Sequence, residues 1–107
     1  MKMIVAIVHD DDAHELMKSL TDSDFRVTKL ATTGGFLRSG NTTLIIGVQK
    51  EKVDQVIKII EDTCCIRTEI MTTSSMMGDN SVMGLPIEIT VGGATVFVLD
   101  VEQNFKF

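Results

Sequence analysis

The segment Thr32–Thr43 contains the residue types best suited to binding an anion. It reads Thr-Thr-Gly-Gly-Phe-Leu-Arg-Ser-Gly-Asn-Thr-Thr, with three glycines within seven residues. Glycine permits backbone conformations in which successive N–H groups point toward one anion. Gly35, Gly40 and Thr42 also have the spacing of a nucleoside-triphosphatase P-loop, but Asn41 stands where that loop requires lysine, and a strand follows in place of a helix. A P-loop is therefore disfavoured, whereas a glycine-bearing hairpin turn remains the structural alternative.

Side chains around this segment favour recognition of a nucleotide base. Phe36 and Leu37 form a large apolar pair where a loop tip normally carries polar residues, and such a pair suits stacking on a base. Arg26 and Thr28 are two residues apart in an extended segment, so they share one face of a sheet. The Asn41 amide offers both a donor and an acceptor, as binding an adenine edge requires. Together these residues predict a local pocket for one small anion.

Other reactive residues do not form a recognisable site. His9, His14 and the run Asp10–Asp12 raise the possibility of a metal site, but acidic residues are also favoured at the start of a helix by its dipole. Cys64 and Cys65 end a predicted helix, where burial is favoured over redox chemistry. No Ser-His-Asp, Cys-His or paired-carboxylate arrangement is visible. We therefore expect no catalytic residues, no metal and no cofactor.

Charge and length limit the kinds of partner. The chain has 107 residues, with 10 Lys and Arg against 15 Asp and Glu, for a net charge of −5. This size predicts a single domain over residues 1–107, and the acidic balance disfavours bulk nucleic-acid binding, which relies on a basic surface. The apolar run Met1–Val8 is too short to span a bilayer. We expect a cytoplasmic protein with no membrane insertion.

The first half of the chain predicts three strands and a helix. Lys2–Val8 is aliphatic, and Phe25–Thr32 and Asn41–Val48 are rich in strand-forming residues, so the last two are expected to form an antiparallel hairpin. Asp12, followed three residues later by Glu15, outlines a capping box for a helix that ends near residues 21–24. Its apolar stripe has helical spacing and comprises Ala13, Leu16, Met17 and Leu20.

The second half predicts another helix and further strands. Val53, Val56, Ile57 and Ile60 repeat the stripe of the first helix, so a helix is expected from about Glu51 to Asp62. Extended segments follow at Thr68–Thr72, Ile87–Val91 and Thr95–Leu99. The core order β-α-β-β-α-β predicts an α+β, ferredoxin-like fold, with a four-stranded antiparallel sheet and both helices on one face. The open face is largely aliphatic, so we expect it to pack against another copy.

Two long motifs resemble a known family. Arg26–Thr43, reading Arg-Val-Thr-Lys-Leu-Ala-Thr-Thr-Gly-Gly-Phe-Leu-Arg-Ser-Gly-Asn-Thr-Thr, and Val91–Leu99, reading Val-Gly-Gly-Ala-Thr-Val-Phe-Val-Leu, are similar to segments of the PII-like cyclic di-AMP receptors of Firmicutes, the PstA/DarA type. The likeness extends over essentially the whole chain. It implies a PII-like homotrimer with one cyclic di-AMP in each cleft between subunits, and a signal transduction protein without catalytic activity.

The resemblance also implies roles for individual residues. The nucleotide would be bordered by Arg26, Val27 and Thr28, and its adenine would be covered by Gly35, Phe36 and Leu37. Its phosphate or base would be contacted by Asn41 and Gly47. From the last strand, the cleft would be lined by Gly92, Gly93 and Phe97, which would reach the ligand across the subunit boundary. Ligand binding would order the segments Gly34–Asn41 and Ser74–Gly84 and so signal to a downstream protein partner.

Two alternatives remain open at this stage. A PII- or CutA-like trimer could instead sense ATP or a metal ion, although the first loop is short and the His and Cys residues do not cluster in the sequence. An uncharacterised enzyme could also be built on the same fold, because a fold alone does not determine function.

Overall fold

The computed structural model describes residues 1–30, 40–72 and 86–107. The elements in chain order are β1 (Lys2–His9), α1 (Asp10–Asp22), β2 (Val27–Lys29), β3 (Asn41–Val48), the 3-10 turn η1 (Lys50–Lys52), α2 (Val53–Cys64), β4 (Arg67–Thr72), β5 (Pro86–Val91) and β6 (Ala94–Asp100).

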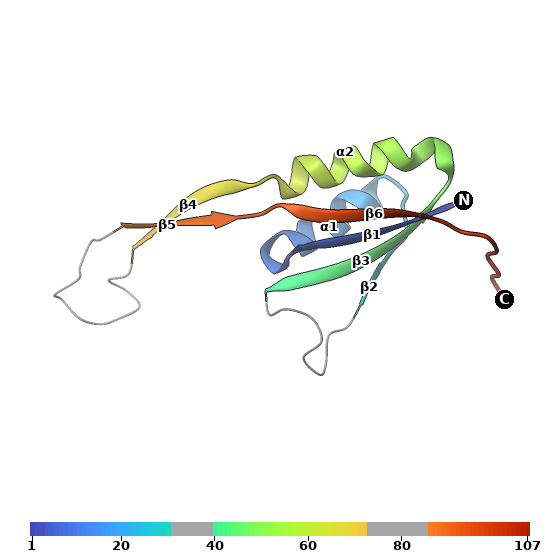
Figure 1. Ribbon diagram of the computed structural model, residues 1–107, viewed down its shortest axis with the longest axis horizontal. Coiled ribbons are helices and arrows are strands. Elements are labelled where there is room, and N and C mark those ends of the chain that lie inside the picture. Colours follow the sequence, from blue (N-terminus) through green and yellow to red (C-terminus); the bar gives the residue numbers. More distant parts are fainter. Residues whose placement is uncertain (31–39, 73–85) are drawn as a thin grey trace.

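Four strands form the main sheet in the order β2-β3-β1-β6, and each strand is antiparallel to its neighbours. Both helices lie on the same face of this sheet (Figure 1). The predicted combination of two helices and an antiparallel sheet is therefore confirmed, and the arrangement is compatible with a ferredoxin-like fold.

The strand that completes the sheet is β6, which pairs with β1 from Lys2 opposite Asp100 to Val8 opposite Ala94. β4 and β5 pair with each other in a separate hairpin between α2 and β6, and this hairpin points away from the main sheet (Figure 1). The expected order β-α-β-β-α-β thus describes the core only when the β4–β5 hairpin is treated as an insertion.

β2 is shorter than the predicted strand Phe25–Thr32. Val27–Lys29 pair with β3 in the expected antiparallel hairpin. Phe25 is buried before the strand begins, and its amide donates to the Leu20 carbonyl oxygen at 2.9 Å. Phe25 therefore closes the turn after α1 instead of extending the sheet. The predicted end of this strand, residues 31 and 32, lies outside the described residues.

α1 begins two residues earlier than predicted, at Asp10, and the expected capping box is not formed. The N-cap residue is His9, which makes no side-chain capping hydrogen bond. Asp12 lies inside the first turn, is 4% exposed and pairs with Arg67. All three aspartates of the first turn still lie at the positive end of the helix dipole, which stabilises negative charge.

The core lies between the helices and one face of the sheet. α1 and α2 contribute residues of the predicted stripes, with Leu16, Leu20, Val56 and Ile60 at most 2% exposed. The strands contribute alternate residues, as expected for a sheet with one covered face; these are Ile4, Ala6, Val8, Leu44 and Ile46. Met17 and Val53, also in the predicted stripes, are partly buried against this cluster.

The opposite face of the sheet is apolar and is not covered by any described element. Strand alternation places Met3, Val5 and Ile45 there, and the edge strand β6 adds Phe97 and Leu99, which are 52% and 44% exposed. Two helices thus cover half of the apolar surface that the sheet presents.

Candidate functional site

Among the residues predicted to bind a ligand, Thr28 and Phe97 lie on opposite edges of the main sheet, and Asn41 and Gly47 lie on the inner strand β3. Thr28 of β2 is opposite Ile45, Ile45 is opposite Val5, and Val5 is opposite Phe97 of β6. Residues directly opposite each other share a face, so Thr28 and Phe97 are the two ends of one row across the open face. Three strand spacings separate them, which is about 14 Å. Within one chain, these two side chains border opposite edges and not one pocket.

The structure groups Arg26 with Gly47. They line an open hollow of about 340 Å³ at the end of the sheet where β3 ends, together with Met1, Asp24, Phe25, Val48, Gln49 and Lys52. Arg26 is exposed immediately before β2, and Lys52 adds a second cation that the sequence did not single out. Val27, the residue between Arg26 and Thr28, points the other way and packs against the core. This hollow can offer positive charge to an anionic ligand.

Asn41, Gly92 and Gly93 form the second group, near the other end of the sheet. They line an open hollow of about 460 Å³ with Ile7, Ile66, Ala94 and Thr95. Asn41 is the first residue of β3 and the two glycines connect β5 to β6. Here an amide side chain that can both donate and accept lines the same hollow as two glycines, a combination that suits recognition of a base edge or a phosphate.

The backbone at Gly92 and Gly93 requires glycine. Both residues have positive φ, at +88° and +87°. A Cβ at Gly92 would lie 2.3 Å from the Cys65 carbonyl oxygen and 2.9 Å from Nη1 of Arg67, and a Cβ at Gly93 would lie 3.1 Å from the Ile66 side chain. The Gly93 amide also donates to the Cys64 carbonyl oxygen. The start of β6 is therefore held against the end of α2 by close backbone contact.

An ion pair beside these glycines was not foreseen from the sequence. Nη2 of Arg67 donates to Oδ1 of Asp12 at 2.7 Å, and Nη1 contacts Oδ2 at 3.5 Å. Nη1 is also 3.3 Å from the Cys65 carbonyl oxygen. In the sequence, the acidic run indicates helix capping, with a metal site as the disfavoured alternative, and no local pattern links position 12 to position 67.

The remaining predicted contacts lie outside the described residues. These are Gly35, Phe36 and Leu37, which were expected to cover an adenine, and most of the segments Gly34–Asn41 and Ser74–Gly84. The described site is thus divided among the Arg26–Gly47 hollow, the Asn41–Gly92–Gly93 hollow and the exposed ring of Phe97.

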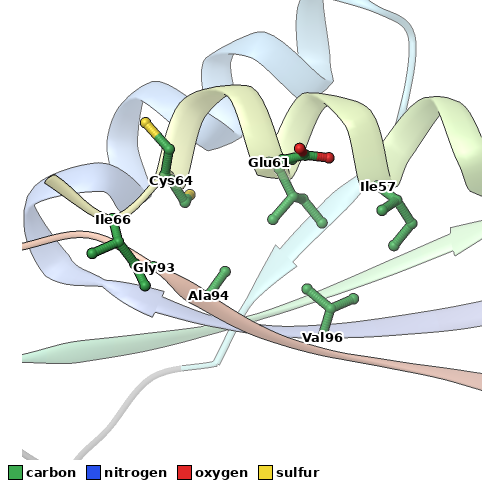
Figure 2. Close-up of a pocket in the computed structure, with 9 residues that line it drawn as sticks. Ile57, Glu61, Cys64, Ile66, Gly93, Ala94 and Val96 are labelled. Carbon is green, nitrogen blue, oxygen red and sulfur yellow. The ribbon is translucent and has the colours of Figure 1, made fainter.

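A third hollow of about 330 Å³ lies between α2 and β6 and is lined mainly by aliphatic side chains. Figure 2 shows Ile57 of α2 and Val96 of β6 on its two sides, with Ile66 and Gly93 at one end. Ile66 and Gly93 also line the Asn41–Gly92–Gly93 hollow, so the two spaces share a wall. Cys64 borders the apolar space with its side chain 2% exposed, and burial raises the pKa of its thiol to about 11.

Among the described residues, no three His, Cys, Asp or Glu side chains lie close enough together to hold a metal ion. Asp10 accepts a hydrogen bond from Oγ1 of Thr42 at 2.5 Å, and Asp12 pairs with Arg67. The helices of the described part are each too short or too polar to cross a membrane.

Comparison with known proteins decides the family. A family model described as cyclic-di-AMP receptor matches residues 1–107, the whole chain. The chain belongs to the cyclic-di-AMP receptor family. This receptor family is the one whose motifs were identified in Arg26–Thr43 and Val91–Leu99, so that resemblance is confirmed. Membership supports a binding and signalling role over catalysis.

A solved structure supports the same fold for this receptor-family chain. It is a protein of unknown function from Pediococcus pentosaceus, 45% identical in sequence, with a TM-score of 0.78. The match covers 99% of this chain and 96% of that one. The likeness therefore includes the β4–β5 insertion as well as the main sheet.

We predict that replacing Gly92 with alanine destabilises the protein more than replacing Gly40. Both glycines have positive φ, +88° and +96°, so both variants carry a backbone cost of about 1–2 kcal/mol. A Cβ at Gly40 meets no atom of the described residues within 4 Å, whereas one at Gly92 collides with Cys65 and Arg67. Thermal unfolding at equal protein concentration measures the difference. Equal losses for the two variants would show that the close approach is unimportant.

The two adjacent cysteines should differ sharply in reactivity. Cys65 is exposed, while the buried thiol of Cys64 has its pKa raised to about 11, and only the thiolate is nucleophilic. At neutral pH we expect iodoacetamide to modify one thiol per folded chain, and none in Cys65→Ser. Modification of Cys64 should accelerate as pH approaches 11. Mass spectrometry after brief alkylation is the check, and prompt modification of Cys64 at neutral pH would contradict the assigned burial.

Proposed function

We propose that this protein is a receptor that binds cyclic di-AMP in clefts between the subunits of a homotrimer. The family match over all 107 residues is the observation that carries the choice of ligand. Each subunit would contribute one domain of this fold, and the complex would transmit ligand occupancy to a downstream protein without chemical turnover.

The division of the site supports a location between subunits. Thr28 and Phe97 occupy opposite edges of one sheet, about 14 Å apart. A ring of identical subunits brings the β2 edge of one chain toward the β6 edge of the next, because a head-to-tail contact repeats until the ring closes. One ligand then reaches Arg26 and Thr28 on one chain and Phe97 on its neighbour.

The open face supports association of the chains. It presents Met3, Val5, Ile45 and Leu99 with no described element over them. Contiguous exposed apolar surface of this kind is uncommon on monomers and marks an interaction site. In a trimer, three such faces would bury one another around the threefold axis.

Charge and chemistry of the described residues suit a cyclic dinucleotide. Three chains at −5 each carry −15 in total, so an anion is repelled except where local donors outweigh this field. Arg26 supplies positive charge, and Asn41 adds an amide that can donate to a phosphate or a base in the hollow that it lines with Gly92 and Gly93. Phe97 is 52% exposed and can stack on an adenine, a contact worth about 1–3 kcal/mol. A few such contacts, less the cost of association, reach micromolar affinity.

Signalling would follow from a shift in population between two loop states. The segments expected to respond are Gly34–Asn41 and Ser74–Gly84, most of which lie outside the described residues. Ligand contacts made in only one of the two states would favour that state and so alter the surface offered to a partner.

Calorimetry tests the ligand and the role of Arg26. We expect cyclic di-AMP to bind with low-micromolar affinity or better, and more tightly than cyclic di-GMP or ATP. Arg26→Ala should weaken binding about 10- to 100-fold, because a hydrogen bond to a charged group is lost. Lys18→Ala removes the same charge from an exposed position on α1 and should bind as the wild type does. No heat with cyclic di-AMP, or an equal loss in both variants, would refute the proposal.

Sedimentation equilibrium tests the assembly. The wild type should sediment at three times the chain mass of 11.8 kDa. Leu99→Asp puts a charge on the open face and should dissociate the trimer, whereas Ile70→Asp, on the hairpin and 67% exposed, should leave it intact. A wild-type monomer at micromolar concentration, or a trimeric Leu99→Asp variant, would contradict this arrangement.

A further inference from the structure

The first turn of α1 contacts both sides of the Asn41–Gly92–Gly93 hollow. On one side, the Asp10 amide donates to the Gly40 carbonyl oxygen at 2.9 Å, and its carboxylate accepts from Oγ1 of Thr42. These two contacts flank Asn41 in the sequence. On the other side, Asp12 holds Arg67, the first residue of β4. One helical turn therefore joins the start of β3 to the base of the β4–β5 hairpin.

Arg67 transmits this contact to the glycines. Its Nη1 lies between Oδ2 of Asp12 and the Cys65 carbonyl oxygen, at 3.5 and 3.3 Å. A Cβ at Gly92 would come within 2.9 Å of the same nitrogen, so the Gly92 backbone rests directly against the guanidinium. Displacement of Arg67 would therefore displace the glycine wall of the hollow.

The two side chains of the Asp12–Arg67 ion pair differ in burial, and the buried one fixes the position of the other. The Asp12 side chain is 5% exposed, whereas that of Arg67 is 36% exposed. A buried carboxylate that loses its partner is strongly unfavourable, so Asp12 holds the guanidinium in one place. Arginine also presents a planar fork that a carboxylate can accept at two oxygens, which restricts rotation of the side chain as well as its distance.

We infer that Asp12 and Arg67 are positioning residues that set the distance between Asn41 and Gly92–Gly93 and couple this wall of the ligand site to the β4–β5 hairpin. The pair itself does not contact the ligand. The inference rests on the proposed binding of cyclic di-AMP. It adds that ligand occupancy and hairpin orientation depend on the same ion pair, so a ligand that presses on the glycine wall also acts on the hairpin.

The decisive comparison is Asp12→Asn against Asp11→Asn. Both variants remove one negative charge from the same helical turn, and Asp11 is exposed and has no role in the hollow. Asp12→Asn should weaken cyclic di-AMP binding about tenfold in calorimetry and increase amide hydrogen exchange in β4 and β5 of the free protein. Exchange in β1 and β3 should stay unchanged, which distinguishes a local release from general loss of stability. Asp11→Asn should match the wild type in both measurements.

Substitution of Arg67 provides a second arm if Asp12→Asn does not fold. Arg67→Lys keeps the charge but not the fork, so its affinity and hairpin exchange should lie between those of the wild type and Arg67→Gln. If Arg67→Lys and Arg67→Gln have the same affinity and the same hairpin exchange, Arg67 has only a packing role and the inference is overturned. Wild-type affinity in Asp12→Asn would overturn it as well. Absence of cyclic di-AMP binding by the wild type itself would instead refute the proposed function. Amide hydrogen exchange of the β4–β5 hairpin in the ligand-free variants would still test whether Asp12 and Arg67 hold the hairpin in place.

Discussion

Two helices can cover only one face of a four-stranded sheet, and the rest of the structure follows from this limit. Leu16, Leu20, Val56 and Ile60 bury the inner face. The outer face and both edge strands, β2 and β6, stay available. Contact with further copies would stabilise such an apolar face, and in the proposed trimer it would also complete a site divided between two sheet edges.

The order of the strands determines which residues each edge contributes. β1 and β3 lie in the centre, so Val27–Lys29 of the first motif form one edge and Ala94–Leu99 of the second form the other. Thr28 and Phe97 are therefore separated across the sheet of one chain, whereas Asn41 of the first motif lines one hollow with Gly92 and Gly93 of the second. In the proposed trimer, the donors of both edges would be gathered locally between chains, while the net charge of −5 per chain disfavours anions elsewhere.

Prediction from the sequence succeeded where the periodicity reports burial directly. The apolar stripes of both helices identify the residues that cover the sheet, because a residue's side of a helix depends only on its spacing. The continuous aliphatic run Lys2–Val8 does not distinguish its two faces, and the structure shows which of its residues are buried. Pairing of strands is not determined locally, so it is the structure, and not the sequence, that assigns the fourth position of the sheet to β6 and leaves Thr68–Thr72 in a separate hairpin.

The site shows the same division between local and distant information. The family resemblance assigns Gly92 and Gly93 to the ligand site, and the structure places them at positive φ in one hollow with Asn41. Asp12 was misassigned as a cap because an acid near a helix start is favoured by the dipole whether or not it has another partner. Its contact with Arg67 joins residues 55 positions apart, and a single sequence contains no sign of it.

The central claim is that one ligand is shared by two chains, and a crystal structure with cyclic di-AMP tests it most directly. The account predicts three ligands per trimer, each contacting Arg26 and Thr28 of one subunit and Phe97 of the adjacent subunit. A ligand held entirely within one chain, or bound at the apolar space between α2 and β6, would contradict it.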